Sequence, residues 1–598
     1  MNENEYQQRI EQLEREVAVL KAKLTAKQKT TRYGLVWEDV PEAFEKEAEN
    51  KIPILEEVKD KAIKNDDGKP THILIEGDNY HALQCLNYTH RGKVDVIYID
   101  PPYNTGATDG QDPFIYRDKR ILDKYPDGTT VPKDSPLRHS YWLSFMSKRL
   151  ELAKNLLSEK GVIFISIDDN EQANLKLLCD KLFKSENCQA TLHIQVRYAD
   201  KSLTEEKPFK PLMEYVLVYS KTNFVPKREE EDYNVDKFCY KITELSEGQR
   251  FTVNGQSVVL FRKGEWKIEK VESSTNNLKE TWITGSIYTK MSYGKVFQTV
   301  IEPRIETDGL NCLYKVIGRG YDGLGYRYYT GPTKKTARFG KMYSGIPLEK
   351  LQEIKHGLAP KRLLPIVTMY DYAADFGNIR TEGGVSYNSG KKPIKMLSQL
   401  IGLHNNNNAI VVDFFAGSAS TLHAVLATNE KDQGKRQCIL VQCNENGICE
   451  QVAYKRCRNV MSDFGNSLKY YKTAFVGDHD AATATDEDKV ELAHKAGNLI
   501  AIAENTLEEI EANDAYQIFN NGGNKYTAVY FTGDLMKMTE FTKKLETLRN
   551  GSKLVKIETY IYCLGNVQQF ENEFINLRRI TLHAIPQPII EIYKQLNA

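Results

Sequence analysis

The sequence has no excess of charge of either sign, with 81 Lys and Arg residues against 81 Asp and Glu residues among its 598. That balance excludes a histone-like polycation and an acidic disordered tail protein. The sequence also has no run approaching the roughly 18 consecutive apolar residues that span a bilayer. Its first residues carry neither the basic head nor the apolar stretch of a signal peptide. We therefore expect a cytoplasmic protein without a membrane segment, and a length of this order predicts about three or four domains.

Cysteine is scarce and does not show the spacing of a metal site. The ten cysteines include no Cys-x2-Cys pair. Their closest cluster is irregularly spaced and lies in apolar surroundings: Cys438, Cys443, Cys449 and Cys457. We therefore predict buried free thiols rather than zinc ligands or disulfides. Asp168 and Asp169 could form a metal pair, but no third ligand lies nearby in the sequence, so no metal site is predicted.

The N-terminal segment 1–30 has the apolar spacing of a short coiled-coil helix. Its apolar residues recur at alternating three- and four-residue steps: Ile10, Leu13, Val17, Leu20 and Leu24. This seam is shorter than the about three or four heptads of a well-defined coiled coil. A helix docked on its own domain and a helix that forms a dimer are both compatible with the pattern.

The rest of the chain indicates an α/β sheet with a long insertion. Short apolar runs such as 94–100, 161–169 and 214–221 alternate with helical patterns, and the rhythm resumes at 392–457. Such alternation is typical of a mostly parallel sheet covered on both faces. The predicted domains are the N-terminal helix (1–30), two halves of one sheet domain (31–221 and 391–470), an insertion (222–390) and a small C-terminal α+β domain (471–598).

The strongest local signal is the tetrapeptide Asp100-Pro101-Pro102-Tyr103, which directly follows the apolar strand at 94–99. Ligands of open α/β sheets bind beyond the carboxyl ends of the strands. The two prolines remove two backbone donors and stiffen the turn. The turn would then present a carboxylate, a free carbonyl and an aromatic ring, which suit a planar substrate with an exocyclic amino group. A proline-rich turn with an N-capping aspartate is the structural alternative.

A second ligand-type loop joins the apolar strand at 409–413 to a helix. It reads Asp413-Phe414-Phe415-Ala416-Gly417-Ser418-Ala419-Ser420. Small residues let a ligand approach the backbone, and the N-terminus of the helix favours an anionic group such as a carboxylate. No Gly-Lys-Ser/Thr follows, so the loop is not a P-loop. Taken alone it could be a tight turn, but together with the first loop it indicates a ligand site.

These features resemble the β-group adenine-N6 DNA methyltransferases, in particular the Mod subunits of type III restriction–modification systems. The resemblance covers 71–221 and 391–457, and less strongly 309–347. It includes both loops, their order around an insertion, and three shorter matches: Gly77-Asp78-Asn79, EYVLVYSK at 214–221 and Lys392-Pro393. The fold it implies is a Rossmann-like sheet that uses S-adenosylmethionine, with permuted motif order and an inserted target-recognition domain.

The resemblance also implies roles for the matching residues. Asp100 and the Pro101 carbonyl would accept hydrogen bonds from the amino group of a flipped-out adenine, and Tyr103 would stack on the base, with Pro102 completing the catalytic turn. The methyl group would pass in line to nitrogen with no metal and no covalent enzyme intermediate. The predicted cofactor-binding residues are Asp78, Asp100, Lys392, Pro393, Asp413, Phe415, Ala416, Gly417, Ser418 and either Gln442 or Glu445.

This chain departs from the family pattern in two places, and the second departure leaves the choice between Gln442 and Glu445 open. Ala419 stands where the final glycine of the cofactor loop is usual, a small change that we expect to be tolerated. An acidic residue normally ends the next strand and holds the ribose hydroxyls. Strict spacing puts Gln442 there, and the nearest carboxylate is Glu445.

Within the insertion, residues 309–345 combine seven Lys or Arg with one acidic residue and seven Tyr or Phe. Basic residues neutralise phosphates, while aromatic residues and glycines let a loop lie against a groove or a displaced base. The predicted phosphate contacts are Lys334, Lys335, Arg338 and Lys341, and the predicted base contacts are Arg319 and Arg327. A solvated basic surface is the alternative.

The sequence thus predicts a sequence-specific DNA adenine-N6 methyltransferase. The resemblance implies double-stranded DNA as the substrate, a homodimer, and a helicase–nuclease restriction subunit as a partner. Two alternatives remain open. One is a DNA-recognition scaffold that recruits the nuclease, and the other is a methyltransferase that acts on cytosine N4, RNA or protein.

Overall fold

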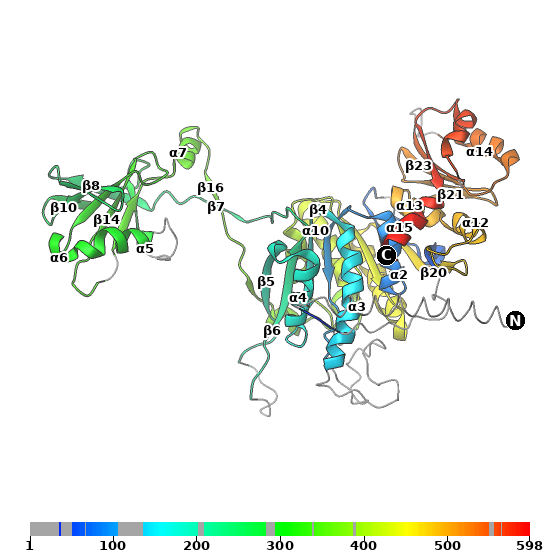
Figure 1. Cartoon of the computed structure of the whole chain (residues 1–598), viewed down its shortest axis with the longest axis horizontal. Helices are drawn as coiled ribbons and strands as arrows, with labels where there is room; N and C mark the ends of the chain where they lie inside the picture. The colour runs from blue at the N-terminus through cyan, green and yellow to red at the C-terminus, as the bar shows by residue number, and fades with distance from the viewer. Residues whose placement is uncertain are drawn as a thin grey trace, which may run out of the picture. The chain divides into compact units, whose positions relative to one another are not determined.

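The computed structural model describes residues 35–37, 51–65, 67–105, 136–200, 208–282, 293–337, 340–386, 390–548, 555–563 and 565–597. The predicted N-terminal helix at 1–30 and Arg338 lie outside these residues. The chain divides into two compact units (Figure 1). The first combines Met1–Lys227 with Val367–Ala598, and the second is Arg228–Ile366.

The first unit is built on a ten-stranded sheet whose centre is parallel. Its strands, in spatial order, are β1 (Ile52–Glu57), β20 (Ser467–Val476), β2 (Thr71–Glu76), β19 (Gln437–Gln442), β18 (Ile410–Asp413), β3 (Val94–Ile99), β4 (Leu157–Ile167), β6 (Met213–Ser220), β5 (Cys188–Gln195) and β17 (Met369–Asp371). The central strands are apolar along their length because both faces of the sheet are covered. The predicted α/β fold class is therefore confirmed.

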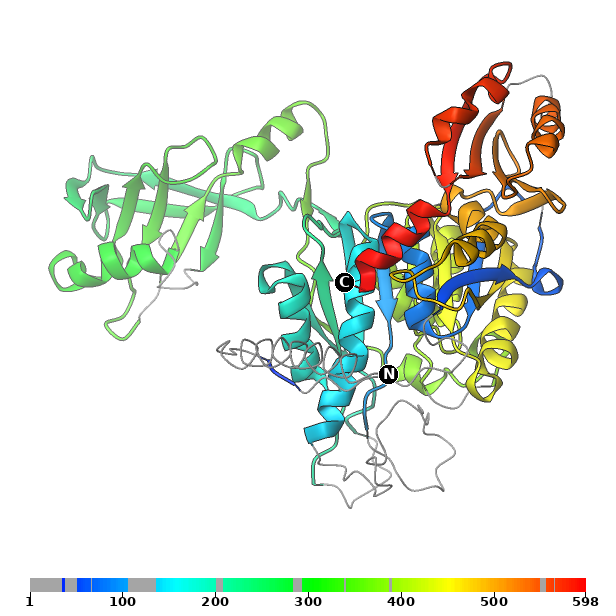
Figure 2. The same ribbon diagram turned by 45° about the vertical axis from the view of Figure 1, so that its right-hand side comes forward.

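Helices cover both faces of this sheet, as Figure 2 shows. One face packs against α2 (Asn79–Thr89), α3 (Pro136–Leu156) and α4 (Gln172–Phe183), and the other against α9 (Ile394–Gly402), α10 (Ser420–Asp432) and α11 (Lys455–Phe464). The neighbouring parallel strands β3 and β18 lead to helices on opposite faces, α3 and α10. The chain thus diverges after these two strands, and such a switch point leaves a crevice at their carboxyl ends.

The C-terminal part is more closely joined to the sheet than predicted. The expected boundary at 471 falls inside β20, which pairs with β2. Next, α12 (Asp486–Lys495) and α13 (Gly497–Glu504) contribute to the same core as α2. A five-stranded sheet then follows, with α14 (Leu535–Thr547) and α15 (Gln587–Asn597): β21 (Glu508–Ala512), β22 (Tyr516–Asn520), β23 (Lys525–Tyr530), β24 (Lys556–Tyr562) and β25 (Ile580–Ile585). The helix expected near 491–511 ends at Glu504, and β21 replaces its last turn.

The second unit is an antiparallel sheet domain. Its eight strands are, in spatial order, β11 (Trp266–Lys270), β8 (Phe238–Glu244), β12 (Leu278–Trp282), β15 (Lys341–Ser344), β14 (Tyr326–Thr330), β13 (Leu313–Ile317), β10 (Gln256–Phe261) and β9 (Gln249–Val253). The predicted insertion of 222–390 is longer than this unit, since β17 joins the large sheet by pairing in parallel with β5. A short ladder between β7 (Glu230–Asp232) and β16 (Lys361–Leu363) ties the two ends of the unit together.

Three further properties concern the described part of the chain. All ten cysteines are free and most are buried, as predicted. No helix among the described residues is long and apolar enough to cross a membrane. These residues also contain no group of three or more His, Cys, Asp or Glu side chains that could hold a metal ion.

Candidate active site

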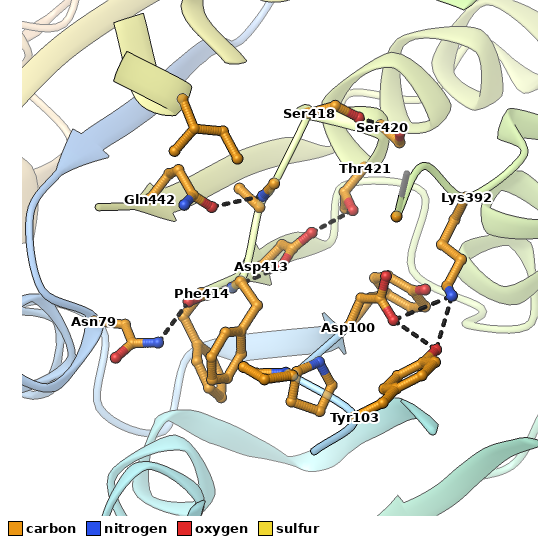
Figure 3. Close-up of a pocket in the computed structure, with 18 of the residues that line it drawn as sticks. Asn79, Asp100, Tyr103, Lys392, Asp413, Phe414, Ser418, Ser420, Thr421 and Gln442 are labelled. Carbon is orange, nitrogen blue, oxygen red and sulfur yellow. Dashed lines mark hydrogen bonds and ion pairs between the residues drawn. The ribbon is translucent and has the colours of Figure 1, made fainter. Parts of the chain in front are cut away.

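A pocket of about 520 Å³ opens at the carboxyl ends of β3 and β18, where the chain diverges (Figure 3). A volume of this order suits a small-molecule cofactor together with part of a substrate. Most of the predicted catalytic and cofactor residues line it: Asp100, Pro101, Pro102, Tyr103, Lys392, Asp413, Phe415, Ala416, Gly417, Ser418 and Gln442. The two sequence loops therefore meet in one site because β3 and β18 are neighbours in the sheet.

At the catalytic turn, four side chains form one hydrogen-bonded network. The Lys392 ammonium lies 3.2 Å from Asp100 Oδ1 and donates to Glu214 Oε2 at 2.8 Å. It also donates to the Tyr103 hydroxyl at 2.7 Å. That hydroxyl lies 2.8 Å from Asp100 Oδ1 and 3.1 Å from Glu214 Oε2, so its single hydrogen has two carboxylate acceptors. One lysine thus faces two carboxylates in a largely buried site.

The charges in this network shift one another's proton affinity. Burial raises the pKa of Asp100 above its ordinary value and Glu214 adds to the rise, while Lys392 opposes it. Burial alone would lower the pKa of Lys392, but the two carboxylates outweigh it and hold that pKa above the ordinary value. Burial and the same carboxylates raise the pKa of Tyr103 well above its usual range. The lysine and the tyrosine therefore both keep their protons at neutral pH.

The backbone of the turn is held from outside the network. The indole of Trp142, on α3, donates to the Pro102 carbonyl at 2.7 Å. Asn104 adopts the left-handed conformation at φ 55° and donates to Glu171 Oε1 at 2.6 Å. These contacts fix the direction in which the Asp100 carboxylate is presented.

The second loop is organised by Asp413. Its carboxylate accepts from the Phe415 backbone N–H at 3.0 Å and from the Thr421 hydroxyl at 2.5 Å. Burial raises the pKa of Asp413 to about 7, although both hydrogen bonds oppose the rise. Asp413 thus supports the loop from the end of β18.

Two residues of this loop adopt left-handed backbone conformations. Gly417 lies at φ 51°, and its N–H donates to Gln442 Oε1 at 2.6 Å. Ala419 lies at φ 62°, a conformation that costs a non-glycine residue about 1–2 kcal/mol. The alanine in place of the usual glycine is thus accommodated in the conformation that a glycine would adopt.

Three predicted cofactor residues do not line the pocket. Asp78 caps α2 by accepting from the Tyr80 N–H at 2.7 Å, and it pairs with Arg149. Pro393 precedes α9 as its N-cap, and Glu445 lies in a 3-10 turn after β19. Of the two candidates for the ribose contact, Gln442 lies in the pocket and Glu445 does not.

The sequence reasoning missed Glu214, Asn79 and Asp168 as lining residues. Glu214 is near the start of β6, which runs antiparallel to β4, so its first residues lie at the edge where the parallel strands end. The polar residue that opens the apolar segment 214–221 was the signal that could have indicated it. Asn79 donates to the Phe414 carbonyl at 3.0 Å and so links α2 to the cofactor loop.

In the second unit, the residues predicted to contact DNA differ in how exposed they are and in whether they are already paired. Lys334 and Lys335 are exposed. Arg319 donates to Gln256 Oε1 at 2.9 Å, and Lys341 pairs with Glu280 at 2.9 Å. Arg327 is only 7% exposed and forms an ion pair with Asp322. Arg327 is therefore withdrawn from the predicted base contacts, because its side chain is buried and paired with Asp322.

Comparison with known proteins bears on what such a pocket does. The family described as DNA methylase, of the N6/N4 type, matches residues 94–453, which is more than half of the chain. The chain belongs to this DNA methylase family. The matched range contains both pocket loops and the entire insertion between them. The predicted membership of a DNA methyltransferase family is thus confirmed.

Among curated proteins, this chain is similar to restriction–modification enzymes. The StyLTI Mod subunit of a type III enzyme from Salmonella typhimurium is 28% identical over 75% of this chain and 63% of its own length. The EcoP15I Mod subunit from Escherichia coli is 28% identical over 66% of this chain and 61% of its own. The type II methyltransferase M.KpnI from Klebsiella pneumoniae is 28% identical over 66% and 86%. The chain thus spans less than two thirds of the two Mod subunits.

Proposed function

We propose that the chain transfers a methyl group from S-adenosylmethionine to the N6 amino group of an adenine in double-stranded DNA, as the modification subunit of a type III restriction–modification system. The observation that carries the proposal is the buried Asp100 carboxylate beside the cofactor loop of the same pocket. Aspartate at this position favours adenine over cytosine-N4 in the family that the sequence resembles. The similarity to Mod subunits supports the restriction–modification context.

The pocket residues suit this reaction. S-adenosylmethionine supplies an electrophilic methyl group on its sulfonium. The two N–H groups of the adenine amino group donate hydrogen bonds to the Asp100 carboxylate and the Pro101 carbonyl, which directs the nitrogen lone pair toward the methyl group. Lys392 holds the Asp100 carboxylate in its charged form, and that negative charge stabilises the positive charge that develops on nitrogen. As the new bond forms, the nitrogen releases one proton toward the carboxylate.

The small-residue loop suits the cofactor. Phe415, Ala416, Gly417 and Ser418 all line the pocket, and Gln442 ends the neighbouring strand there. The exposed Lys334 and Lys335 of the second unit are proposed to contact DNA phosphates, with Arg319 and Lys341 as further contacts. We further propose a cytoplasmic homodimer that works with a helicase–nuclease restriction subunit.

Expression of the chain in a methylase-free bacterial host tests the function directly. Single-molecule sequencing of the host DNA is expected to find N6-methyladenine within one short sequence motif and none in cells carrying the empty vector. Methylation at cytosine N4 would leave the enzyme class intact but overturn the adenine assignment. If no base is modified while the folded protein accumulates, the proposal fails.

A scaffold without catalytic activity is the second candidate, since Mod-type proteins also recognise DNA for a partner. Purified chain incubated with duplex DNA and labelled S-adenosylmethionine separates the two. A scaffold incorporates no label, whereas a methyltransferase incorporates it into DNA and not into RNA or added protein.

Replacing Gly417 with aspartate is expected to abolish detectable binding of S-adenosylmethionine. Gly417 lines the pocket, so the new carboxylate would take up space in the cofactor loop and repel an anionic ligand group. Isothermal titration calorimetry measures the loss, and Gly402→Asp on α9 serves as a control because that glycine has open space around it. Unchanged affinity in Gly417→Asp would contradict the cofactor site.

A further inference from the structure

A fully buried arginine lies behind the cofactor loop and was not indicated by any motif. Arg456, on α11, is 0% exposed. One of its terminal nitrogens donates to Ser420 Oγ at 2.8 Å and to Ser418 Oγ at 3.2 Å. Both serines line the pocket, and Figure 3 shows them side by side where α10 begins. The arginine therefore reaches the pocket only through two hydroxyl groups.

The hydrogen bonds around this guanidinium determine what the serines can do. The same nitrogen of Arg456 supplies one hydrogen to each serine oxygen, so each oxygen acts as an acceptor toward the arginine. The hydroxyl hydrogens must then point elsewhere. The two oxygens are 3.1 Å apart, so one hydroxyl can donate to the other, and at least one hydrogen is left for a group in the pocket. The pair presents a donor to the ligand.

The other side of Arg456 is paired with a carboxylate. Its second terminal nitrogen donates to Glu382 Oε2 at 3.1 Å and lies 3.5 Å from His423 Nδ1. Burial, with the charge of Arg456, lowers the pKa of His423 to about 4, so this histidine is neutral at neutral pH. The arginine and Glu382 thus balance each other.

Lys391 adds a second buried cation to the same region. Its ammonium donates to backbone carbonyls, including that of Val385 at 2.6 Å and that of Glu382 at 3.2 Å, and among the described residues it pairs with no carboxylate. Burial, with the charge of Arg456, lowers the pKa of Lys391 to about 8. Two cations and one carboxylate leave an excess positive charge around Arg456, and an anionic ligand group would offset it.

We propose that Arg456 is a positioning residue that makes the Ser418 and Ser420 hydroxyls donors for a carboxylate, so that the pocket selects cofactors by the carboxylate of their amino-acid end. This inference rests on the proposed use of S-adenosylmethionine. It assigns the anionic end of the ligand to the start of α10, where the backbone N–H groups favour the same charge. The reacting end then faces Asp100, Glu214 and Lys392.

The test compares two ligands that differ only in this carboxylate, S-adenosylmethionine and its decarboxylated analogue. Arg456→Gln is expected to weaken binding of S-adenosylmethionine by about 10–100-fold, since the serine hydroxyls lose the charged donor that orients them toward the carboxylate. Binding of the analogue is expected to change by less than about 3-fold. The double variant Ser418→Ala/Ser420→Ala is expected to show the same selectivity. Calorimetry on the full chain measures all affinities. The measurement uses no DNA, so the recognised DNA sequence need not be known.

Arg436→Gln is the matched control. Arg436 is also almost fully buried and pairs with Asp432, but it lies before β19, at the opposite end of that strand from the pocket. If a variant acted only by destabilising the fold, it would lower the affinity for both ligands by the same factor, in this control as in Arg456→Gln. If Arg456→Gln does not fold, the serine variant decides. Equal losses for both ligands in the serine variant would overturn the inference, whereas a wild-type chain that binds neither ligand would overturn the proposed function.

Discussion

Asp100→Asn is expected to lower the rate of methyl transfer by about 10²–10⁴-fold while leaving the binding of cofactor and DNA nearly unchanged. The amide keeps the shape of the side chain but removes the charge that stabilises the developing cation. It also brings an NH₂ group to a site where two N–H bonds need acceptors, so the amino nitrogen of the substrate loses its orientation. Single-turnover kinetics with labelled cofactor measures the rate.

The control for this variant is Asp169→Asn. Asp169 follows β4 and accepts from Tyr215 at 2.7 Å on an exposed part of the chain, outside the pocket lining. The Asp169→Asn variant removes the same charge from the same edge of the sheet, and its rate of methyl transfer should stay within a few-fold of the wild type. An Asp100→Asn enzyme as fast as this control would mean that Asp100 does not contact the reacting amino group.

Lys392→Met is expected to move the acidic limb of the pH–rate profile to higher pH by about 1–3 units. Lys392 lowers the pKa of Asp100, so without it burial and Glu214 raise that pKa further. The reaction needs the Asp100 carboxylate as an anion, which is lost as the pH falls below its pKa. Activity should therefore be lost at a higher pH than in the wild type on acidification and should recover as the pH rises. The profile of kcat against pH measures the shift.

Lys395→Met tests whether any lysine on α9 has this effect. Lys395 is exposed and pairs with Asp375 at 3.3 Å. Its removal should leave the profile where it is in the wild type. A Lys392→Met enzyme that loses activity equally at every pH would show that the lysine acts only by holding the Tyr103 side chain in place.

The parts of the site that the sequence predicted are those encoded within one loop. The two loops that start at Asp100 and Asp413 each follow an apolar strand. The groups that each loop offers to a ligand can be inferred from its consecutive residues. That the loops meet follows from the general rule for parallel sheets. The pairing of β3 with β18 then supplies the contact. The central strands were predicted for the same reason, because burial on both faces leaves continuous apolar runs.

The parts that could not be predicted depend on register and on contacts between distant segments. Glu214 reaches the pocket because β6 runs antiparallel to its neighbours, a direction that its sequence does not encode. Arg456 reaches the cofactor loop through the packing of α11 against α10. Arg327 was predicted from charge alone, but it is buried and paired with Asp322, which lies in a loop before β14. The short edge strand β17 carries too few residues to show a pattern.

The ladder between β7 and β16 brings the two ends of the second unit together before they join the large sheet. Glu230 pairs in register with Leu363 and Asp232 with Lys361, and ion pairs join Lys361 to Glu230 and Arg362 to Glu231. Because the ladder already holds the two ends of the unit together, the unit acts as a closed loop between two strands of the large sheet. Forming that sheet therefore costs little additional conformational entropy, whatever the length of the unit. A different domain with paired ends could be grafted between these strands with the catalytic pocket intact. The ladder thus provides a joint at which one inserted domain can be replaced by another.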